Sequence, residues 1–149
     1  MARRRGTRGD DHLIGTSGRD YIDGRDGDDT IIGGPGDDTI DGCSGNDYIK
    51  AGSGDESVTD FTAGAGTDDR LDVFEFGFTD LADLWGAADD GNGANPETVI
   101  SLDPDDSVTL IGIQKADLHD DDFLFWAALA VQFGIVAEDA VFVERDALA

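Results

Sequence analysis

One acidic side chain recurs at every ninth residue in the first part of this chain. Six consecutive nine-residue units run from Gly6 to Thr59 without an insertion, and the sixth residue of each unit is acidic. These residues are Asp11, Asp20, Asp29, Asp38, Asp47 and Glu56. Asp is favoured in turns for its own sake, so one such residue alone would indicate only a turn. Six in register favour a second interpretation, a row of oxygen ligands for hard cations.

Two other positions of the nine-residue repeat explain how these carboxylates would be positioned. The fourth residue of every unit is glycine and the eighth is aliphatic. Glycine adopts the positive φ that a tight turn requires, and it leaves backbone carbonyls free to point inward. The residues around the eighth position alternate in direction, so one aliphatic side chain per unit points inside. Each unit is therefore expected to be a turn followed by a very short strand.

Two such units complete one coil, so unit n should stack on unit n+2 through parallel strands. The predicted fold is an all-β solenoid with a thin core of two aliphatic ladders. One ladder would contain Leu13, Ile31 and Ile49, and the other Ile22, Ile40 and Val58.

The same stacking brings the sixth-position carboxylates together. Asp11 would lie near Asp29 and Asp29 near Asp47, while Asp20 would lie near Asp38 and Asp38 near Glu56. Like charges held together in partly dehydrated turns are costly, so a cation is expected between them. Calcium takes six to eight carboxylate and carbonyl oxygens in loose geometry, whereas magnesium requires a tighter octahedron. Zinc prefers His and Cys ligands, which are scarce here. Calcium is the predicted ion.

The units resemble the G-G-x-G-x-D-x-U-x nonapeptide of the RTX, or haemolysin-type calcium-binding, family. GGPGDDTID, which begins at Gly33, fits every position. Other units depart at the second glycine, and the last unit has Ala51 for the first glycine and Glu56 for Asp. The residues that replace the second glycine are Thr7, Thr16, Arg25 and Cys43.

This resemblance implies a right-handed parallel β-roll that binds calcium through sixth-position carboxylates and turn carbonyls. Six turns paired n with n+2 would share about four sites. It also implies export through type I secretion machinery, and it extends loosely over residues 58–73 and 120–125. The turn glycines assigned to the metal sites are Gly18, Gly27, Gly36 and Gly45.

The chain divides into four segments by composition. Residues 1–5 are a basic terminus, expected to be solvated; residues 6–59 are the repeats; residues 60–125 close and cap the roll; residues 126–149 are a tail with an apolar start. The capping region is predicted to contain a closing strand that begins at Phe74, a short helix that ends near Trp85 and a loop over 87–96. A β-hairpin is expected over 98–113. Trp85 and the three nearby Phe residues are expected to form the cap core.

The apolar run over 123–137 is too short for a membrane span. Two interpretations of it stay open: a helix that packs on the cap, or an apolar element of a C-terminal export signal. The N-terminus has basic residues but no apolar stretch of a cleavable signal peptide.

The net charge of −24 argues against binding to nucleic acid or to anionic membranes. Cys43 is the only cysteine, so no intramolecular disulfide can form. A chain this acidic and glycine-rich should be expanded without metal and fold when calcium binds. It would stay unfolded in a calcium-poor cytosol and fold outside the cell, which predicts a secreted, extracellular protein.

No catalytic motif is present, so the chain is expected not to be an enzyme. Two other functions stay open. One is a calcium-dependent carbohydrate-binding module of a polysaccharide-modifying enzyme, with an extracellular polysaccharide as partner. The other is the C-terminal export module of a toxin or protease.

Overall fold

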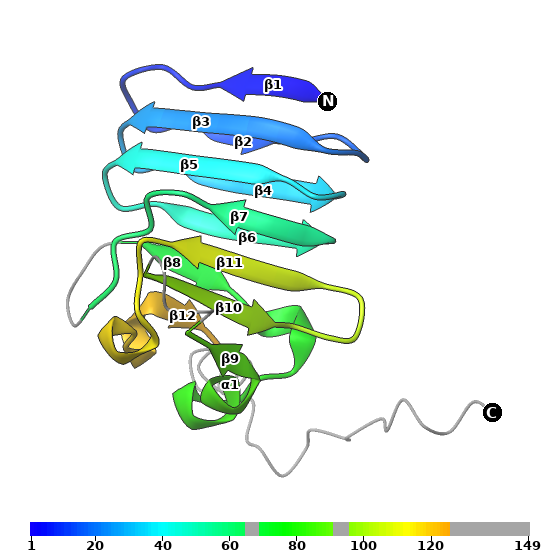
Figure 1. Ribbon diagram of the computed structural model, residues 1–149. Helices are drawn as coiled ribbons and strands as arrows, with labels where there is room; N and C mark the ends of the chain where they lie inside the picture. The colour runs from blue at the N-terminus through cyan, green and yellow to red at the C-terminus, as the bar shows by residue number, and fades with distance from the viewer. Residues whose placement is uncertain (65–68, 91–95, 126–149) are drawn as a thin grey trace, which may run out of the picture.

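Two stacked β-sheets form this protein, and the chain passes between them at every turn. The computed structural model describes residues 1–64, 69–90 and 96–125. Figure 1 shows the strands layered along one axis, with the N-terminal strand at one end and the helix α1 (Leu81–Ala87) at the other. None of the helices in these described ranges is long and apolar enough to cross a membrane.

The larger sheet has seven strands, and its first five are parallel. In spatial order they are β1 (Ala2–Arg5), β3 (Asp20–Asp26), β5 (Thr39–Ser44), β7 (Asp55–Val58), β11 (Ser107–Ile111), β10 (Glu97–Ser101) and β9 (Ala88–Asp89). The smaller sheet contains β2 (His12–Ile14), β4 (Thr30–Pro35), β6 (Tyr48–Ser53), β8 (Arg70–Asp72) and β12 (Phe123–Leu124). All neighbours in the smaller sheet are parallel. The predicted β-roll is confirmed.

The core consists of the two aliphatic ladders that the repeat predicted. Ile22 pairs with Ile40 and Ile40 with Val58 in one sheet, and Leu13 pairs with Ile31 and Ile31 with Ile49 in the other. The aliphatic residues inside each ladder are at most 1 % exposed, and only Leu13, at the open end, is partly exposed. Residues beyond the repeats continue both ladders, because Leu110 pairs with Val58 and Leu71 pairs with Ile49. The cap therefore extends the core of the roll instead of forming a second one.

The predicted hairpin is present and docks on the last repeat. Strands β10 and β11 are antiparallel, and β11 lies parallel to β7, with Val108 opposite Glu56. The helix is also present; its N-cap is Asp80, whose side chain accepts a hydrogen bond from the amide of Asp83. The short 3₁₀ helices η2 (Lys115–Asp117) and η3 (Asp120–Asp122) follow the hairpin.

Three predictions for the cap were wrong. Phe74–Phe76 form a 3₁₀ helix, η1, instead of a strand, because Gly77 turns the backbone with a φ of 81°. Within the predicted loop over 87–96, Ala88 and Asp89 form strand β9. Trp85 is 42 % exposed, so it is not a core residue. Its ring lies under the ammonium of Lys115, which also donates to the carbonyls of Trp85 and Ala88. Phe78 is buried as predicted.

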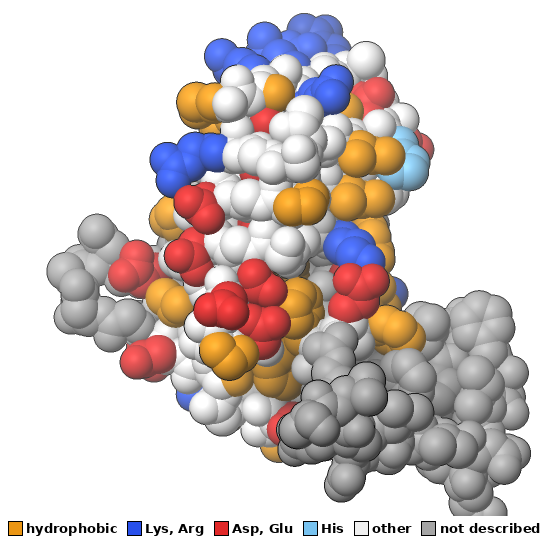
Figure 2. Space-filling model, turned by 90° about the vertical axis from the view of Figure 1, so that its right-hand side faces the viewer, with side chains coloured by type: hydrophobic (Ala, Val, Ile, Leu, Met, Phe, Trp, Pro, Cys, Tyr) orange, Lys and Arg blue, Asp and Glu red, His pale blue; other side chains and the backbone are white. Residues whose placement is uncertain are grey.

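The N-terminal residues are part of the sheet. Strand β1 pairs with β3, and the amide of Ala2 donates to Oδ1 of Asp20 at 2.7 Å. The expectation of a solvated terminus was therefore wrong for the backbone, although the arginine side chains are exposed. Figure 2 shows basic side chains at this end of the roll and acidic ones lower down. The predictions for 126–137 and for the tail lie outside the described residues.

Candidate metal centre

The sixth-position carboxylates form two vertical columns, one on each side of the roll. In each column, one carboxylate oxygen accepts a hydrogen bond from the backbone amide of the equivalent residue one coil earlier. Asp29 Oδ1 accepts from Asp11 at 2.8 Å, and Asp47 Oδ1 accepts from Asp29 at 2.9 Å. In the other column, Asp38 Oδ1 accepts from Asp20 at 2.8 Å. The predicted proximity of successive carboxylates is therefore present, and these hydrogen bonds fix one oxygen of each.

Asp69 continues the first column beyond the repeats. Its Oδ1 accepts from the amide of Asp47 at 2.9 Å, and the residue is 2 % exposed. Sequence analysis missed Asp69 because it follows Asp47 by twenty-two residues instead of eighteen. A local signal was present: Asp69-Arg70-Leu71 has the acidic and aliphatic residues of positions six and eight, and Leu71 pairs with Ile49.

The second carboxylate oxygen is buried without a protein partner in three of the repeats. Within the described residues, the Oδ2 atoms of Asp29, Asp38 and Asp47 have no hydrogen-bond partner, although each residue is only 1 % exposed. Both carboxylate oxygens of Glu56 are also buried without a hydrogen-bond partner. A buried carboxylate oxygen without a partner is costly, so each is a position where a cation would be stabilising.

The first two repeats differ, because their own backbone satisfies this oxygen. The amide of Thr16 donates to Asp20 Oδ2, and the Thr16 hydroxyl donates to the same atom at 2.8 Å. The amide of Thr7 donates to Asp11 Oδ2 at 2.5 Å. The ligand roles predicted for Asp11 and Asp20 stay predictions, and the second oxygen of each already has a protein donor.

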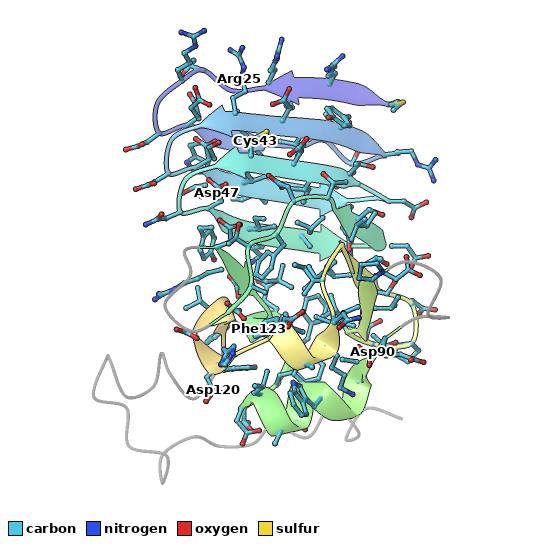
Figure 3. The ribbon with its side chains drawn as sticks, turned by 60° about the vertical axis from the view of Figure 1, so that its left-hand side comes forward. Arg25, Cys43, Asp47, Asp90, Asp120 and Phe123 are labelled. Carbon is cyan, nitrogen blue, oxygen red and sulfur yellow. The ribbon has the colours of Figure 1, made fainter. Side chains whose placement is uncertain are left out.

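Backbone conformation at the second position distinguishes the two kinds of turn. Arg25, Gly34 and Cys43 all have positive φ, of 88°, 96° and 70°, in the repeats whose Asp Oδ2 lacks a partner. Thr7 and Thr16 are not among the positive-φ residues. Figure 3 shows Arg25 and Cys43 stacked on neighbouring coils, where they pair in register, and Asp47 in the turn that follows Cys43. We call the turns of Asp29, Asp38 and Asp47 the open turns, and those of Asp11 and Asp20 the closed turns.

Glycines at the first position leave space beside the open oxygens. A β-carbon built on Gly24 would lie 2.3 Å from Asp29 Oδ2 and 2.7 Å from the carbonyl oxygen of Gly42 on the next coil. One built on Gly33 would lie 2.1 Å from the carbonyl oxygen of Ala51 and 2.9 Å from Asp38 Oδ2. Carboxylate and carbonyl oxygens thus converge where a side chain is absent. This donor set fits calcium, and sequence analysis had not singled out these glycines.

The fourth-position glycines Gly27, Gly36 and Gly45 allow the close stacking of the turns, whereas a β-carbon on Gly18 would meet nothing within 4 Å. Gly27, Gly36 and Gly45 have positive φ, whereas Gly18 does not. A β-carbon on Gly45 would lie 2.2 Å from the carbonyl oxygen of Gly27. Their predicted part in metal binding stays a prediction.

The pKa shifts separate the open turns from the closed turn of Asp20 in the same way. Burial raises the pKa of Asp29 and of Asp38, and neighbouring carboxylates add to the rise. Burial raises the pKa of Asp47 to about 6, and the negative charges of Asp69 and Asp29 contribute. By contrast, the Thr16 amide lowers the pKa of Asp20. Without a cation the open carboxylates therefore keep their protons to a higher pH than a free Asp does, because their negative charge is poorly compensated.

A second group of carboxylates surrounds the only cysteine and is bonded internally. Asp60 accepts hydrogen bonds from the amides of Gly42, at 2.9 Å, and of Cys43. The Cys43 thiol donates to Asp41 Oδ1 at 3.2 Å, and burial raises its pKa to about 12. Strand β7 ends at Val58, so the next coil has no strand residues to accept from these two amides, and the Asp60 side chain accepts from them instead. Ligand atoms of Asp41, Cys43 and Asp60 nevertheless lie within 4.8 Å of one another, which is close enough to hold a metal ion.

Comparison with known proteins identifies the repeats. The family model of the RTX calcium-binding nonapeptide repeat matches residues 5–40 and 32–59. The search of curated proteins found no match. Two solved structures from Azotobacter vinelandii are similar, the AlgE6R3 and AlgE6R2 subunits of a mannuronan C5-epimerase. The first is 26 % identical with a TM-score of 0.38, covering 83 % of this chain and 81 % of that one. The second is 25 % identical with a TM-score of 0.32, covering 83 % and 92 %.

Proposed function

Because residues 5–59 match the model of the RTX calcium-binding nonapeptide repeat, we propose that this chain is a calcium-dependent folding module in which Asp29, Asp38 and Asp47 are the principal ligands. The observation that carries the proposal is the set of Oδ2 atoms in the open turns, which are buried without a partner. Those of Asp29 and Asp38 also lie beside carbonyl oxygens of the next coil. The module is structural and not catalytic. Its carboxylates build the turns and bind the ion.

Calcium would contribute directly to the stability of the roll. Each open turn holds a carboxylate that costs free energy when charged and alone, and a bound dication removes that cost. Free energy of binding to a site that exists only in the folded chain is also free energy of folding. The net charge of −24 adds repulsion that opposes compaction without metal. Calcium is therefore expected to determine whether the chain is folded.

This coupling supports a role in secretion. A chain that is unfolded at low calcium can pass through a narrow export channel, and it would fold in roughly millimolar extracellular calcium. We propose export by type I secretion machinery and an extracellular location, in keeping with the family resemblance of the repeats. The module would then fold on the far side of the membrane.

A calcium titration followed by circular dichroism tests the proposal. We expect a cooperative gain of β signal with calcium that magnesium does not reproduce and that excess chelator reverses. The double variant Asp29→Ala plus Asp38→Ala should lose the response. The matched control, Asp26→Ala plus Asp105→Ala, removes two charges from exposed positions and should keep it. An identical spectrum and melting temperature in calcium and in chelator would refute the proposal.

A further inference from the structure

The residue at the second position of the nine-residue unit belongs to one of two chemical classes. The first two units have threonine there, which is branched at the β-carbon, and the later units have Arg25, Gly34, Cys43 and Gly52. These four have positive φ, of 88°, 96°, 70° and 118° in that order, and neither threonine is among the positive-φ residues. Positive φ is strongly disfavoured for a β-branched residue, less so for an unbranched one and not at all for glycine. Branching of the side chain therefore accounts for the direction of the backbone.

The direction of the backbone at this position matches the state of the carboxylate four residues later. In the two threonine units, the second-position amide donates to Oδ2 of Asp11 or of Asp20. In the four units with positive φ, at least one oxygen of the acidic residue is buried without a hydrogen-bond partner. All six turns lie within residues 1–64 of the described chain, and none departs from this division. The type of residue at the second position thus separates closed turns from open ones.

The threonine amide, and not the hydroxyl, is the donor that both closed turns share. The Thr16 hydroxyl donates to Asp20 Oδ2 at 2.8 Å, in addition to the amide. The Thr7 hydroxyl instead accepts from the amide of Gly9 at 3.3 Å, yet the turn of Asp11 is closed all the same. An amide aimed at the carboxylate oxygen directs the positive end of its dipole to the place that a cation would take. The backbone of the turn therefore replaces the ion.

The oxygens beside the carboxylate are arranged alike in a closed and an open turn. A β-carbon built on Gly15 would lie 1.9 Å from the carbonyl oxygen of Gly33 and 3.0 Å from Asp20 Oδ2. One built on Gly33 would lie 2.1 Å from the carbonyl oxygen of Ala51 and 2.9 Å from Asp38 Oδ2. Carboxylate and carbonyl oxygens therefore converge to the same extent in the turns of Asp20 and Asp38. The two turns differ in the residue at the second position and not in these oxygens.

We propose that β-branching at the second position determines which turns of the roll bind calcium. Thr7 and Thr16 hold their turns closed and exclude the ion from Asp11 and Asp20, so that calcium binds only from the turn of Asp29 onward. The N-terminal turns are then held by hydrogen bonds, and the ions lie in the coils nearer the cap. The inference rests on the proposed function in one respect, namely that calcium is the ion. It adds the residues that select the binding turns, which are not themselves ligands.

The experiment uses the full chain and two matched pairs of variants. Thr16→Gly permits positive φ, whereas its control Thr16→Val removes the hydroxyl and keeps the branched β-carbon. Arg25→Thr places a branched residue in an open turn, whereas its control Arg25→Ser removes the same charge and adds a hydroxyl without the branch. Thr16 is exposed and Arg25 is half-buried, so the core is untouched. Isothermal titration calorimetry measures the calcium stoichiometry, and circular dichroism in saturating calcium reports whether each variant is folded.

We expect Thr16→Gly to bind one calcium ion more than the wild type and Arg25→Thr one ion fewer, while both controls keep the wild-type stoichiometry. Wild-type stoichiometry in a folded Thr16→Gly chain or in Arg25→Thr overturns the inference and leaves calcium binding by the open turns intact. An equal loss in Arg25→Ser also overturns it, because the arginine and not the branching would then be responsible. If Thr16→Gly does not fold, the pair at position 25 decides. A wild type that binds no calcium refutes the proposed function itself.

Discussion

The backbone amide of Asp11 donates a 2.8 Å hydrogen bond to Oδ1 of Asp29, eighteen residues later in the chain. This bond joins consecutive coils and leaves the other oxygen of Asp29 buried without a protein partner. One carboxylate thus has two separate tasks, since one oxygen links the coils and the other is available to an ion. Asp11 belongs to the same column, but its second oxygen accepts from Thr7.

Substitution of these two residues should separate the open turns from the closed ones. Asp29→Asn keeps Oδ1 as an acceptor for the Asp11 amide and removes the charge, so we expect the loss of about one bound calcium ion. Asp11→Asn is the matched control, and we expect it to keep the wild-type stoichiometry. Calorimetric titration measures both. Equal losses from the two variants would show that closed and open turns bind calcium alike.

Filling the space at a first-position glycine should block its site. The β-carbon of Gly24→Ala would lie 2.3 Å from Asp29 Oδ2, so the carboxylate must move and binding at that turn should be lost. The clash should also destabilise the calcium-bound fold by about 1–3 kcal/mol. Gly18→Ala is the control, because a β-carbon there meets nothing within 4 Å. Urea unfolding in saturating calcium would contradict this prediction if both variants had the same midpoint.

The metal-free chain should become less ordered as pH rises. The pKa of Asp47 is raised from 3.8 to about 6 and that of Glu56 from 4.5 to about 8. An acid whose pKa is raised by folding stabilises the fold below its unfolded pKa, and this contribution is lost as pH rises through the folded value. The lowered pKa values of Asp20 and Asp37 act in the opposite direction, but only near or below pH 4.

Circular dichroism in chelator should therefore show more β signal at pH 5 than at pH 8.5. With calcium present the trend should reverse, because the ion binds the deprotonated carboxylates. Glu56→Gln should remove the part of the change between pH 6 and 8, since its amide does not titrate. A metal-free signal that increases with pH would contradict the prediction.

At position 43, a glycine variant should be more stable than an alanine variant. Its φ of 70° lies in the left-handed region, where a β-carbon costs about 1–2 kcal/mol. Glycine removes this cost but has more conformational entropy to lose on folding. We expect Cys43→Gly to be more stable than Cys43→Ala by about 1 kcal/mol, since alanine removes the thiol and keeps the β-carbon. Urea unfolding in calcium measures the difference, and an alanine variant of equal or greater stability would contradict it.

The nine-residue period determined the roll and its core. Each unit is too short for anything except a turn and a brief strand, so Leu13, Ile31 and Ile49 could stack in only one register. The sixth-position carboxylates were equally predictable, because the repeat that stacks the aliphatic residues also stacks the acidic ones. The resemblance to the RTX repeat rested on the same positions of the nine-residue unit, and the family match confirms it.

Beyond the repeats, prediction from local pattern was less successful. The alternation of Phe74, Phe76 and Phe78 indicated a strand, but Gly77 turns the chain and the segment is a 3₁₀ helix. Trp85 looked like a core residue by type, yet it lies on the surface with Lys115. Without a repeat, nothing in the local sequence specifies which neighbour each side chain meets.

The sequence by itself determined which residues stack and therefore which carboxylates meet, because a fixed period turns spacing along the chain into position in space. Only the tertiary structure decided which carboxylate oxygens lack partners, since that depends on whether the Thr16 amide turns toward Asp20. It also brought Asp69 under Asp47 and Asp106 beside the turn of Glu56. These contacts join segments with no common period, so the packing of the cap on the roll fixes them.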